Sequence, residues 1–206
     1  MRPELRPDRP ITLVSSYGTA FYSGMVPALI AGVVKRTEAS INLRSLAQKA
    51  GVAFVQATVT GIDPPQGLQL RDHPDLGFGL VSLNLGSVTR RQGHLNAIAI
   101  KPLEPALKAI RAQDVLANNP DTHPFHCVGA GLAAVEIALA LRQRWPLRPL
   151  ILHTGGRPLH PSMVRELMQA DIKLSDNAAP DTANTLLCTG SEAPSWLAQS
   201  LSLIHI

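Results

Sequence analysis

Aromatic residues are scarce in this sequence. Phe, Trp and Tyr together make up 4% of the 206 residues. Proteins that bind single-stranded nucleic acid stack the bases on rows of aromatic side chains, and so few aromatics cannot form such a platform. The core must therefore be built from Leu, Ala, Val and Ile, in a chain whose hydrophobic content is 45%.

The sequence also has no large excess of positive or negative charge. The 19 basic and 15 acidic residues leave a formal net charge of +4. Because no dense basic stripe is present, the sequence predicts no nucleic-acid partner. The excess arginines are interpreted as solvated surface charge and as cations at a helix C-terminus. These arginines are Arg2, Arg6, Arg9, Arg90, Arg91, Arg142, Arg144 and Arg148.

Cysteine is limited to Cys127 and Cys188, each inside an apolar run. Their spacing forms no CxxC pair, which excludes a local redox dithiol and a local zinc site, and no metal site is predicted. We expect buried, unreactive thiols in a reducing cytosol. No uncharged apolar run is long enough to cross a bilayer. The sequence thus predicts a cytoplasmic chain, with peripheral attachment to the inner face of the membrane as the alternative.

Short, closely spaced elements characterise the first 120 residues. A turn at Asp63–Pro65 and the hairpin-like spacing beyond it predict a small antiparallel β insertion attached to a parallel sheet. Asn42 is a candidate helix cap, and Gly51 a candidate helix end. The expected strands are Ile11–Ser15, Val52–Val59, Leu68–Leu70 and Leu80–Leu85, and the expected helices are Gly24–Ala31, Leu43–Ala50 and Lys101–Ala117.

Strands alternate with helices beyond residue 121, which is typical of βαβ units on a parallel sheet. The polar segment Asn118–Asp121 is the best candidate linker, so the sequence predicts a domain boundary near residue 120. The expected strands are Phe125–Val128, Pro149–His153, Ile172–Leu174 and Thr185–Cys188, and the expected helices are Leu132–Arg144 and Met163–Ala170.

A GxGxxA turn joins the first of these strands to the first of these helices. Gly129 permits a tight turn, Gly131 lets the backbone approach a pyrophosphate, and Ala134 lets the helix sit close to the sheet. A pyrophosphate would meet free N–H groups and the positive end of the helix dipole. A close-packed turn without a ligand is the alternative. The candidate cofactor-binding residues here are Gly129, Ala130, Gly131, Leu132 and Ala133.

The strand after this turn should end in an acidic residue that binds the adenosine ribose, yet residues 150–157 contain neither Asp nor Glu. Arg157 either favours a 2′-phosphate, which indicates NADP, or is a loop cation. Glu136 lies in an otherwise apolar helix, where it is either exposed or held near the cofactor, and it is the candidate catalytic residue. His126 is interpreted as a packed or capping histidine. No Ser/His/Asp or HExxH pattern supports a hydrolase.

Runs over nearly the whole chain carry a family resemblance. These runs are Ile11–Ser15, Tyr22–Pro27, Leu29–Gly32, Ala57–Asp63, Val81–Ser87, Ile100–Pro102, the Gly129 turn, Leu187–Gly190 and Pro194–Ala198. In this order the chain resembles the pyridine nucleotide-disulfide oxidoreductase superfamily of two-dinucleotide flavoproteins. The likeness is greatest to the type II NADH dehydrogenase-like branch, notably the flavoprotein modules fused to selenide, water dikinase. The lack of a paired cysteine motif agrees with the branch that has no redox disulfide.

The resemblance implies an α/β fold with two dinucleotide-binding (Rossmann-like) units, the first of them incomplete, and FAD and NAD(P)H as cofactors. The implied reaction is hydride transfer from NAD(P)H to the flavin, then electron delivery to a quinone or another acceptor. An association with a selenophosphate-synthesising domain is a further implication. The residues implied at the nicotinamide-dinucleotide site are Gly129, Gly131, Glu136 and Gly190. Those implied near the flavin are Val59, Gly86, Ser87 and Lys101.

Two departures from the family pattern shape the expected organisation. The first strand and GxGxxG turn that bind the flavin should precede Ile11 but are not found, nor is the final Gly-Asp segment. We interpret residues 1–120 as a partial FAD-binding domain and residues 121–200 as an NAD(P)-binding domain. Residues 201–206 are interpreted as an artefactual tail, with a natural apolar terminus as the alternative. A non-flavin NADP-dependent reductase and a catalytically empty interaction module are the rival functions.

Overall fold

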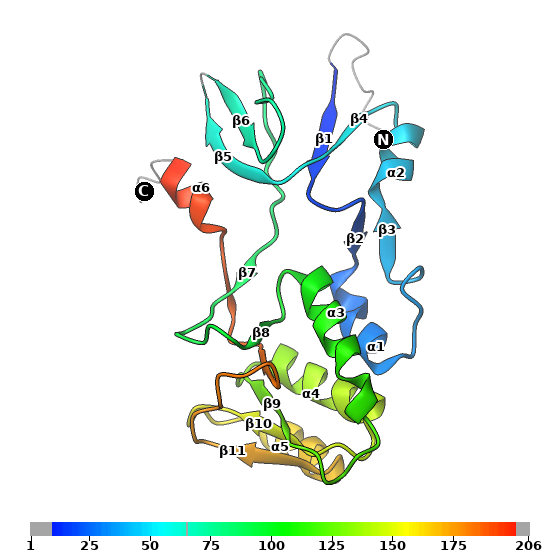
Figure 1. Cartoon of the computed structure of the whole chain (residues 1–206), viewed down its shortest axis with the longest axis vertical. Coiled ribbons are helices and arrows are strands. Elements are labelled where there is room, and N and C mark those ends of the chain that lie inside the picture. The colour runs from blue at the N-terminus through cyan, green and yellow to red at the C-terminus, as the bar shows by residue number, and fades with distance from the viewer. Residues whose placement is uncertain (1–9, 65, 201–206) are drawn as a thin grey trace. The chain divides into compact units, whose positions relative to one another are not determined.

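The computed structural model describes residues 10–64 and 66–200. The expected tail at residues 201–206, the arginines of the leader and Pro65 of the expected turn lie outside these residues. The chain forms two compact units from interleaved segments (Figure 1). Unit 1 combines Met1–Tyr22, Ser40–Leu85 and Pro194–Ile206, and unit 2 combines Ser23–Ala39 and Gly86–Ala193.

Unit 1 consists of paired short strands and short helices. A parallel pair joins β1 to β4, and antiparallel pairs join β2 to β3 and β5 to β6. The β5–β6 hairpin is the antiparallel insertion that the sequence predicts. The strands are β1 Thr12–Ser15, β2 Thr19–Phe21, β3 Ser40–Asn42, β4 Ala53–Gln56, β5 Val59–Asp63 and β6 Gly67–Leu70. The helices are α2 Leu43–Lys49 and α6 Ser195–Ser200.

Local sequence signals explain parts of unit 1. Asn42 Oδ1 accepts a hydrogen bond from Ser45 N at 2.9 Å, so the predicted helix cap is confirmed. The hairpin buries Ile62, Leu68 and Leu70 together, and Trp196 of α6 packs against them. The alternating apolar residues of the hairpin thus provide the core of the unit.

Two strand predictions in unit 1 need correction. The expected strand Leu80–Leu85 is wrong, because this segment has no regular structure and Leu80 is 88% exposed. Its spaced leucines resemble strand alternation, but no backbone ladder pairs with it. The expected strand Val52–Val59 divides into β4 and β5, and Ala57 N between them donates to Ser15 O at 3.1 Å.

Unit 2 is built on a parallel sheet with the strand order β11-β10-β9-β12-β8. The sheet strands are β8 Ile98–Ala99, β9 Phe125–Val128, β10 Leu150–His153, β11 Ile172–Ser175 and β12 Thr185–Leu187. A separate antiparallel pair consists of β7 Val88–Thr89 and β13 Ser191–Glu192. The α/β alternation predicted beyond residue 121 is therefore confirmed.

Helix α4 forms the centre of unit 2, and it contacts α1, α5 and three strands of the sheet (Figure 1). Its residues Ala134, Ala138 and Leu141 are fully buried, which explains why the sequence of this helix is apolar nearly all round. The helices of the unit are α1 Val26–Ala31, α3 Leu103–Ala112, α4 Leu132–Arg144 and α5 Pro161–Gln169, with single turns of 3-10 helix at Ser23–Met25 and Asp114–Leu116.

Helix α3 is shorter than the predicted helix Lys101–Ala117. Pro102 has an extended backbone at its N-cap position, so the helix begins at Leu103. At the other end the α-helix stops before Gln113, and a 3-10 turn follows.

The two units divide the chain differently from the boundary that the sequence predicts near residue 120. The change from unit 1 to unit 2 lies at Leu85–Gly86, and Ser23–Ala39 also belongs to unit 2. Strand β8 adds to the edge of the parallel sheet, so it joins the unit of β9 although it precedes Asn118–Asp121. A polar loop inside a unit has the same composition as a linker between units, and composition alone cannot distinguish them.

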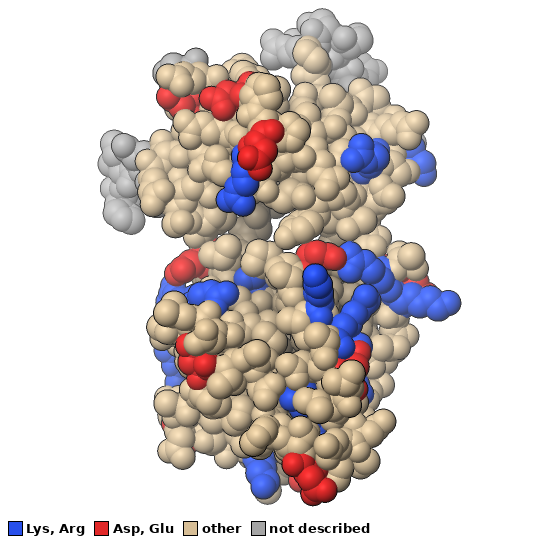
Figure 2. Space-filling view, viewed as in Figure 1, with Lys and Arg blue, Asp and Glu red and all other residues tan. Residues whose placement is uncertain are grey.

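Charged side chains of both signs are mixed on the face shown in Figure 2, and no extended patch of one sign appears there. Arg142 donates to the carbonyl oxygens of Trp145, Pro146 and Arg148 beyond the end of α4, as expected for a cation at a helix C-terminus. Arg148 contradicts its interpretation as solvated charge. It is completely buried, and its guanidinium lies 5.0 Å from the Phe125 and Trp145 ring centroids.

Within the described ranges, no helix has both the length and the hydropathy needed to cross a membrane.

Candidate functional site

The glycine-rich turn lies between β9 and α4, where the sequence predicts it. Gly129 has a φ of 150°, and a Cβ at this position would lie 2.5 Å from Cys188 O and 2.9 Å from Ala134 Cβ. Ala134 is itself fully buried. Both small residues are therefore required by the close approach of the helix, the turn and the end of β12.

Gly131 has the opposite surroundings. A Cβ built on it meets no atom within 4 Å, so it faces open space directly before α4. Gly131 is the N-cap and offers no side chain to the N–H groups of the first turn. Its carbonyl oxygen accepts from Ala134 N and Val135 N, which begins the helical hydrogen-bond pattern. The turn thus presents the positive end of a long helix next to a space that a larger residue would fill, an arrangement suited to an anion.

The turn also lies where the strand order of the sheet reverses. The chain passes from β9 to β10 and β11 on one side, then returns to β12 on the other side of β9. At the carboxyl ends, Gly129 N donates to His153 O at 2.9 Å and Cys188 N donates to Val128 O at 2.8 Å. In open parallel sheets, ligands bind outside the carboxyl ends of the strands at such a reversal.

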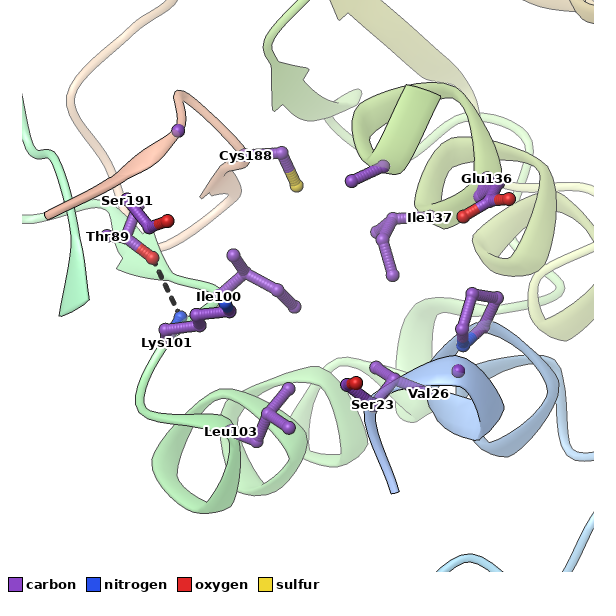
Figure 3. A pocket seen from close by; sticks show the side chains of 14 residues that line it. Ser23, Val26, Thr89, Ile100, Lys101, Leu103, Glu136, Ile137, Cys188 and Ser191 are labelled. Carbon is purple, nitrogen blue, oxygen red and sulfur yellow. Dashed lines mark hydrogen bonds between the residues drawn. The ribbon is translucent and has the colours of Figure 1, made fainter. Parts of the chain in front are cut away.

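A cavity of about 380 Å³ adjoins this reversal, within the size range of small-molecule sites (Figure 3). Ala133, Glu136 and Ile137 form one wall, since these positions share one face of α4. In Figure 3 Ile100 and Ile137 extend toward the middle of the cavity from opposite sides. The other lining residues are Ser23, Gly24, Val26, Pro27, Thr89, Lys101, Leu103, Cys188, Gly190 and Ser191.

The structure brings only some of the predicted site residues to this cavity. Those that line it are Ala133, Glu136, Gly190 and Lys101. Those of unit 2 that do not line it are Gly86, Ser87, Gly129, Ala130, Gly131, Leu132 and Arg157. Val59 belongs to unit 1, at the start of β5.

Lys101 and Ser87, both predicted near the flavin, are in contact. Lys101 Nζ donates to Ser87 Oγ at 2.9 Å, and Lys101 N donates to Thr89 Oγ1 at 2.8 Å (Figure 3). Gly190 O accepts from Arg90 N at 3.1 Å. The ammonium group of Lys101 is therefore held by the Ser87 hydroxyl, and the Lys101 backbone by the Thr89 hydroxyl.

Glu136 and Arg157 differ in their surroundings. Glu136 is exposed on α4, as one of the two interpretations expects, and it also lines the cavity. Arg157 is exposed and follows Gly155 and Gly156, which both have left-handed backbone conformations. Arg157 N donates to Thr154 O at 3.3 Å, which closes a tight turn after β10.

The two thiols are free and lie near the end of β9 and the end of β12. Desolvation and the neighbouring Cys188 raise the pKa of Cys127 well above its usual value, and desolvation raises the pKa of Cys188 to about 12. Both thiols are therefore protonated at neutral pH and are poor nucleophiles. This agrees with their interpretation as unreactive cysteines.

His126 is packed against a second histidine. His126 Nδ1 and His153 Nε2 are 2.9 Å apart, and His153 Nδ1 lies 2.9 Å from Asn177 O. Because a carbonyl oxygen only accepts, His153 Nδ1 carries a proton and its Nε2 accepts from His126 Nδ1. Desolvation and the charge of His153 lower the pKa of His126. The interpretation of His126 as a packed histidine is confirmed.

Several lining residues are absent from the predicted site, among them Ser23, Val26, Thr89, Ile100 and Cys188. Ser23, Val26, Ile100 and Cys188 belong to runs that carry the family resemblance, which was the available signal. Among the described residues, no group of three or more His, Cys, Asp or Glu side chains could hold a metal ion.

No protein-family model matches the sequence, and a comparison with curated proteins gives no match. Solved structures do match. Reduced CoADR-RHD from Bacillus anthracis has a TM-score of 0.72 and 15% identity, over 93% of this chain and 41% of that chain. NADH:rubredoxin oxidoreductase from Clostridium acetobutylicum has a TM-score of 0.69 and 13% identity, over 95% of this chain and 56% of that chain.

NDH2 from Plasmodium falciparum in complex with NADH has a TM-score of 0.69 and 12% identity, over 95% of this chain and 53% of that chain. The chain therefore spans about half the length of the structures it matches. Over that length, it has the α/β fold of the pyridine nucleotide-disulfide oxidoreductases.

Proposed function

We propose that unit 2 binds a nicotinamide dinucleotide and that the whole protein is an FAD-dependent NAD(P)H oxidoreductase. The observation that carries this proposal is the turn from Gly129 to Gly131, located where the strand order of the parallel sheet reverses. The fold shared with oxidoreductases over 93% to 95% of the chain supports it. Residues 86–193, rather than 121–200, then contain the main part of the NAD(P)-binding domain.

The residues of the turn fit the pyrophosphate of such a cofactor. The open space at Gly131 admits a phosphate, and the N–H groups of Leu132 and Ala133 in the first turn of α4 are available as donors. The dipole of a helix of 13 residues favours the negative charge. Ala130 completes the turn that directs the backbone toward the ligand.

The cavity supplies the groups that would orient the reacting end of the cofactor. Glu136 offers a carboxylate that can accept from a carboxamide or a ribose hydroxyl. A Cβ on Gly190, which also lines the cavity, would meet no atom within 4 Å, so this position leaves room for a ligand. Ile100 and Ile137 form apolar walls that exclude water. When bound, NAD(P)H would supply a hydride to an acceptor such as a flavin and would be released as NAD(P)⁺.

The flavin part of the proposal is supported by the fold and by the family resemblance. Lys101 and Ser87 form a polar contact in unit 2, and Gly86 precedes them. Val59 belongs to unit 1. Within the described residues, unit 1 has no glycine-rich turn between a strand and a helix that could hold the FAD phosphates.

The family resemblance implies the kind of final electron acceptor. We propose a quinone or another acceptor, and the name of the Clostridium relative gives rubredoxin as the acceptor of that protein. We also propose a cytoplasmic location, with peripheral attachment to the inner face of the membrane as the alternative, because both cysteines are free thiols. An association with a selenophosphate-synthesising domain is proposed on the family resemblance alone.

The test is a titration of the full chain with NADH and NADPH, followed by cofactor fluorescence. Gly131→Ala should weaken binding by about tenfold or more, because its Cβ would occupy the space of the pyrophosphate. Gly79→Ala is the matched control, since a Cβ there also meets no atom within 4 Å and this glycine lies in unit 1. Failure of both dinucleotides to bind would refute the proposed function.

A further inference from the structure

The carboxyl ends of β10 and β11 bring together two residues that the sequence does not place together. Thr154 follows β10, and Asp176 follows β11. Thr154 Oγ1 donates to Asp176 Oδ1 at 2.7 Å, and Thr154 N donates to Ser175 O at 3.0 Å. Thr154 is buried and Asp176 is exposed, so a fixed donor orients a carboxylate that faces solvent.

This position matters for a dinucleotide held at the Gly129 turn. In folds of this kind the adenosine ribose lies over the end of the strand that follows the glycine-rich turn, and a carboxylate there accepts from its hydroxyls. That strand is β10, which ends at His153 and contributes no carboxylate. His153 is buried, with Nδ1 held by Asn177 O and Nε2 by His126.

We propose that Asp176, oriented by Thr154, is the carboxylate that binds the adenosine ribose, and that unit 2 therefore prefers NADH to NADPH. The inference rests on the proposed function. Asp176 follows β11, the strand beyond β10, and lies 47 positions after Gly129. The motif places the acidic residue only ~20 positions after the glycines, which explains why sequence spacing does not identify Asp176.

The geometry leaves the necessary groups free. Thr154 satisfies one carboxylate oxygen of Asp176, and in the part of the chain that the structure describes, no other group bonds the second oxygen. Gly155 and Gly156 form the adjoining turn, and a Cβ on either would meet no atom within 4 Å. A ribose hydroxyl can approach there and donate to the carboxylate, whereas a 2′-phosphate would bring negative charge against it.

Arg157 supports the opposite preference, because a guanidinium can bind a 2′-phosphate. Arg157 is exposed, and no hydrogen bond of its side chain fixes it among the described residues. Asp176 is instead held by a hydrogen bond of 2.7 Å from a buried hydroxyl. An oriented carboxylate loses less side-chain entropy on binding than a free arginine, so the observations favour NADH.

The test compares the dissociation constants of NADH and NADPH for the full chain, measured by fluorescence titration. We expect NADH to bind at least about tenfold more tightly, since a hydrogen bond to a charged group is lost and a repulsion is gained with NADPH. Asp176→Asn should bring the two constants to within about threefold, and Thr154→Val should reduce the ratio in the same direction. Asp121→Asn, which removes an exposed carboxylate before β9, should leave the ratio unchanged.

The outcomes separate the two proposals. If both dinucleotides bind but NADPH is preferred, or if Asp176→Asn leaves the ratio unchanged, the inference about Asp176 is overturned and the proposed function stands. A loss of NADPH preference in Arg157→Gln would then assign selectivity to Arg157. If neither dinucleotide binds to the unmodified chain, the proposed function fails, and this inference fails with it. Circular dichroism of each variant confirms that it is folded.

Discussion

Gly129 and Gly131 are two positions apart, yet they meet different physical requirements. A side chain at Gly129 would collide with the backbone of Cys188, whereas one at Gly131 would enter open space. The sequence motif assigns both to one ligand-binding pattern. The structure separates a glycine that the fold needs from a glycine that a ligand would need.

We therefore predict that Gly129→Ala lowers the free energy of unfolding by about 2 kcal/mol or more, because neither the Cys188 backbone nor buried Ala134 can move away at low cost. Gly131→Ala should change stability by less than about 1 kcal/mol. Urea unfolding followed by circular dichroism measures both. Equal losses in the two variants would contradict the distinction.

The pair of His126 and His153 makes stability depend on pH. Desolvation and the charge of His153 lower the pKa of His126 below its usual value of 6.5. Between the folded and unfolded pKa values, the unfolded chain binds more protons, so stability rises with pH in that window. The contribution is fully present above pH 6.5 and is lost as the pH falls through the lowered pKa of His126.

The expected result is a urea midpoint that decreases when the pH is lowered from about 7.5 to about 5.5. This range brackets the usual histidine pKa of roughly 6.5. His126→Gln should reduce this dependence on pH, because the imidazole that titrates is gone. The exposed His123 of the same unit offers the matched control for loss of an imidazole. An unchanged slope in His126→Gln would show that other groups cause the dependence.

At the scale of elements, the loop before the edge strand β8 is bonded to the carboxylate of Asp181. Asp181 accepts from the N–H groups of Leu95, Asn96 and Ala97 at 2.9 to 3.0 Å, directly before β8 begins. Desolvation raises the pKa of Asp181. The three hydrogen bonds and the nearby His94 lower this pKa by more than desolvation raises it, so the net shift is downward. The loop thus depends on the ionised form of Asp181.

Asp181→Ala should release this loop and increase amide exchange at Leu95, Asn96 and Ala97, with faster exchange in β8 as a consequence. Asp181→Asn should have a smaller effect, because an amide keeps one accepting oxygen but loses the charge. Hydrogen exchange measured by mass spectrometry tests this, with Asp121→Ala as the control. Unchanged protection of the loop in Asp181→Ala would refute the role of the carboxylate.

The sequence predicts elements well where one local signal decides them. The run from Phe125 to Arg144 contains a buried strand, a glycine turn and an apolar helix, and all three are observed at the predicted bounds. The strand expected at Leu80–Leu85 fails, because pairing depends on a partner strand that the local pattern cannot specify. The prediction that Arg148 is solvated surface charge is wrong for a related reason. Its burial beside Phe125 and Trp145 depends on how segments apart in the sequence pack together.

The candidate site shows the same limit. The Gly129 motif can be recognised in the sequence because its spacing reflects local geometry. The contact between Thr154 and Asp176 is not, because it joins the ends of two strands that become neighbours only in the sheet. The cavity likewise combines α1, α4 and the ends of β8 and β12, which no single run of sequence contains.

At the scale of the whole molecule, the division into units makes the proposed nucleotide site testable by location. Every described residue assigned here to the dinucleotide belongs to unit 2, and unit 1 contributes none of them. Among the described residues, the Gly129 turn and the ends of β10, β11 and β12 are all part of one sheet edge. Binding should therefore change the stability of one unit more than that of the other.

We predict that saturating NADH slows amide exchange at the Gly129 turn, the first turn of α4 and the loop after β12, while β1, β4 and the β5–β6 hairpin keep their exchange rates. Ligand at about 100 times its dissociation constant should stabilise the binding unit by about 2.7 kcal/mol, which is large enough to detect. Gly131→Ala should reduce the protection at the same NADH concentration, while Gly79→Ala should retain it in full. A bound ligand slows amide exchange only where the opening that permits exchange also disrupts the binding site. Equal protection in both units would therefore show that NADH does not act through the unit 2 site alone.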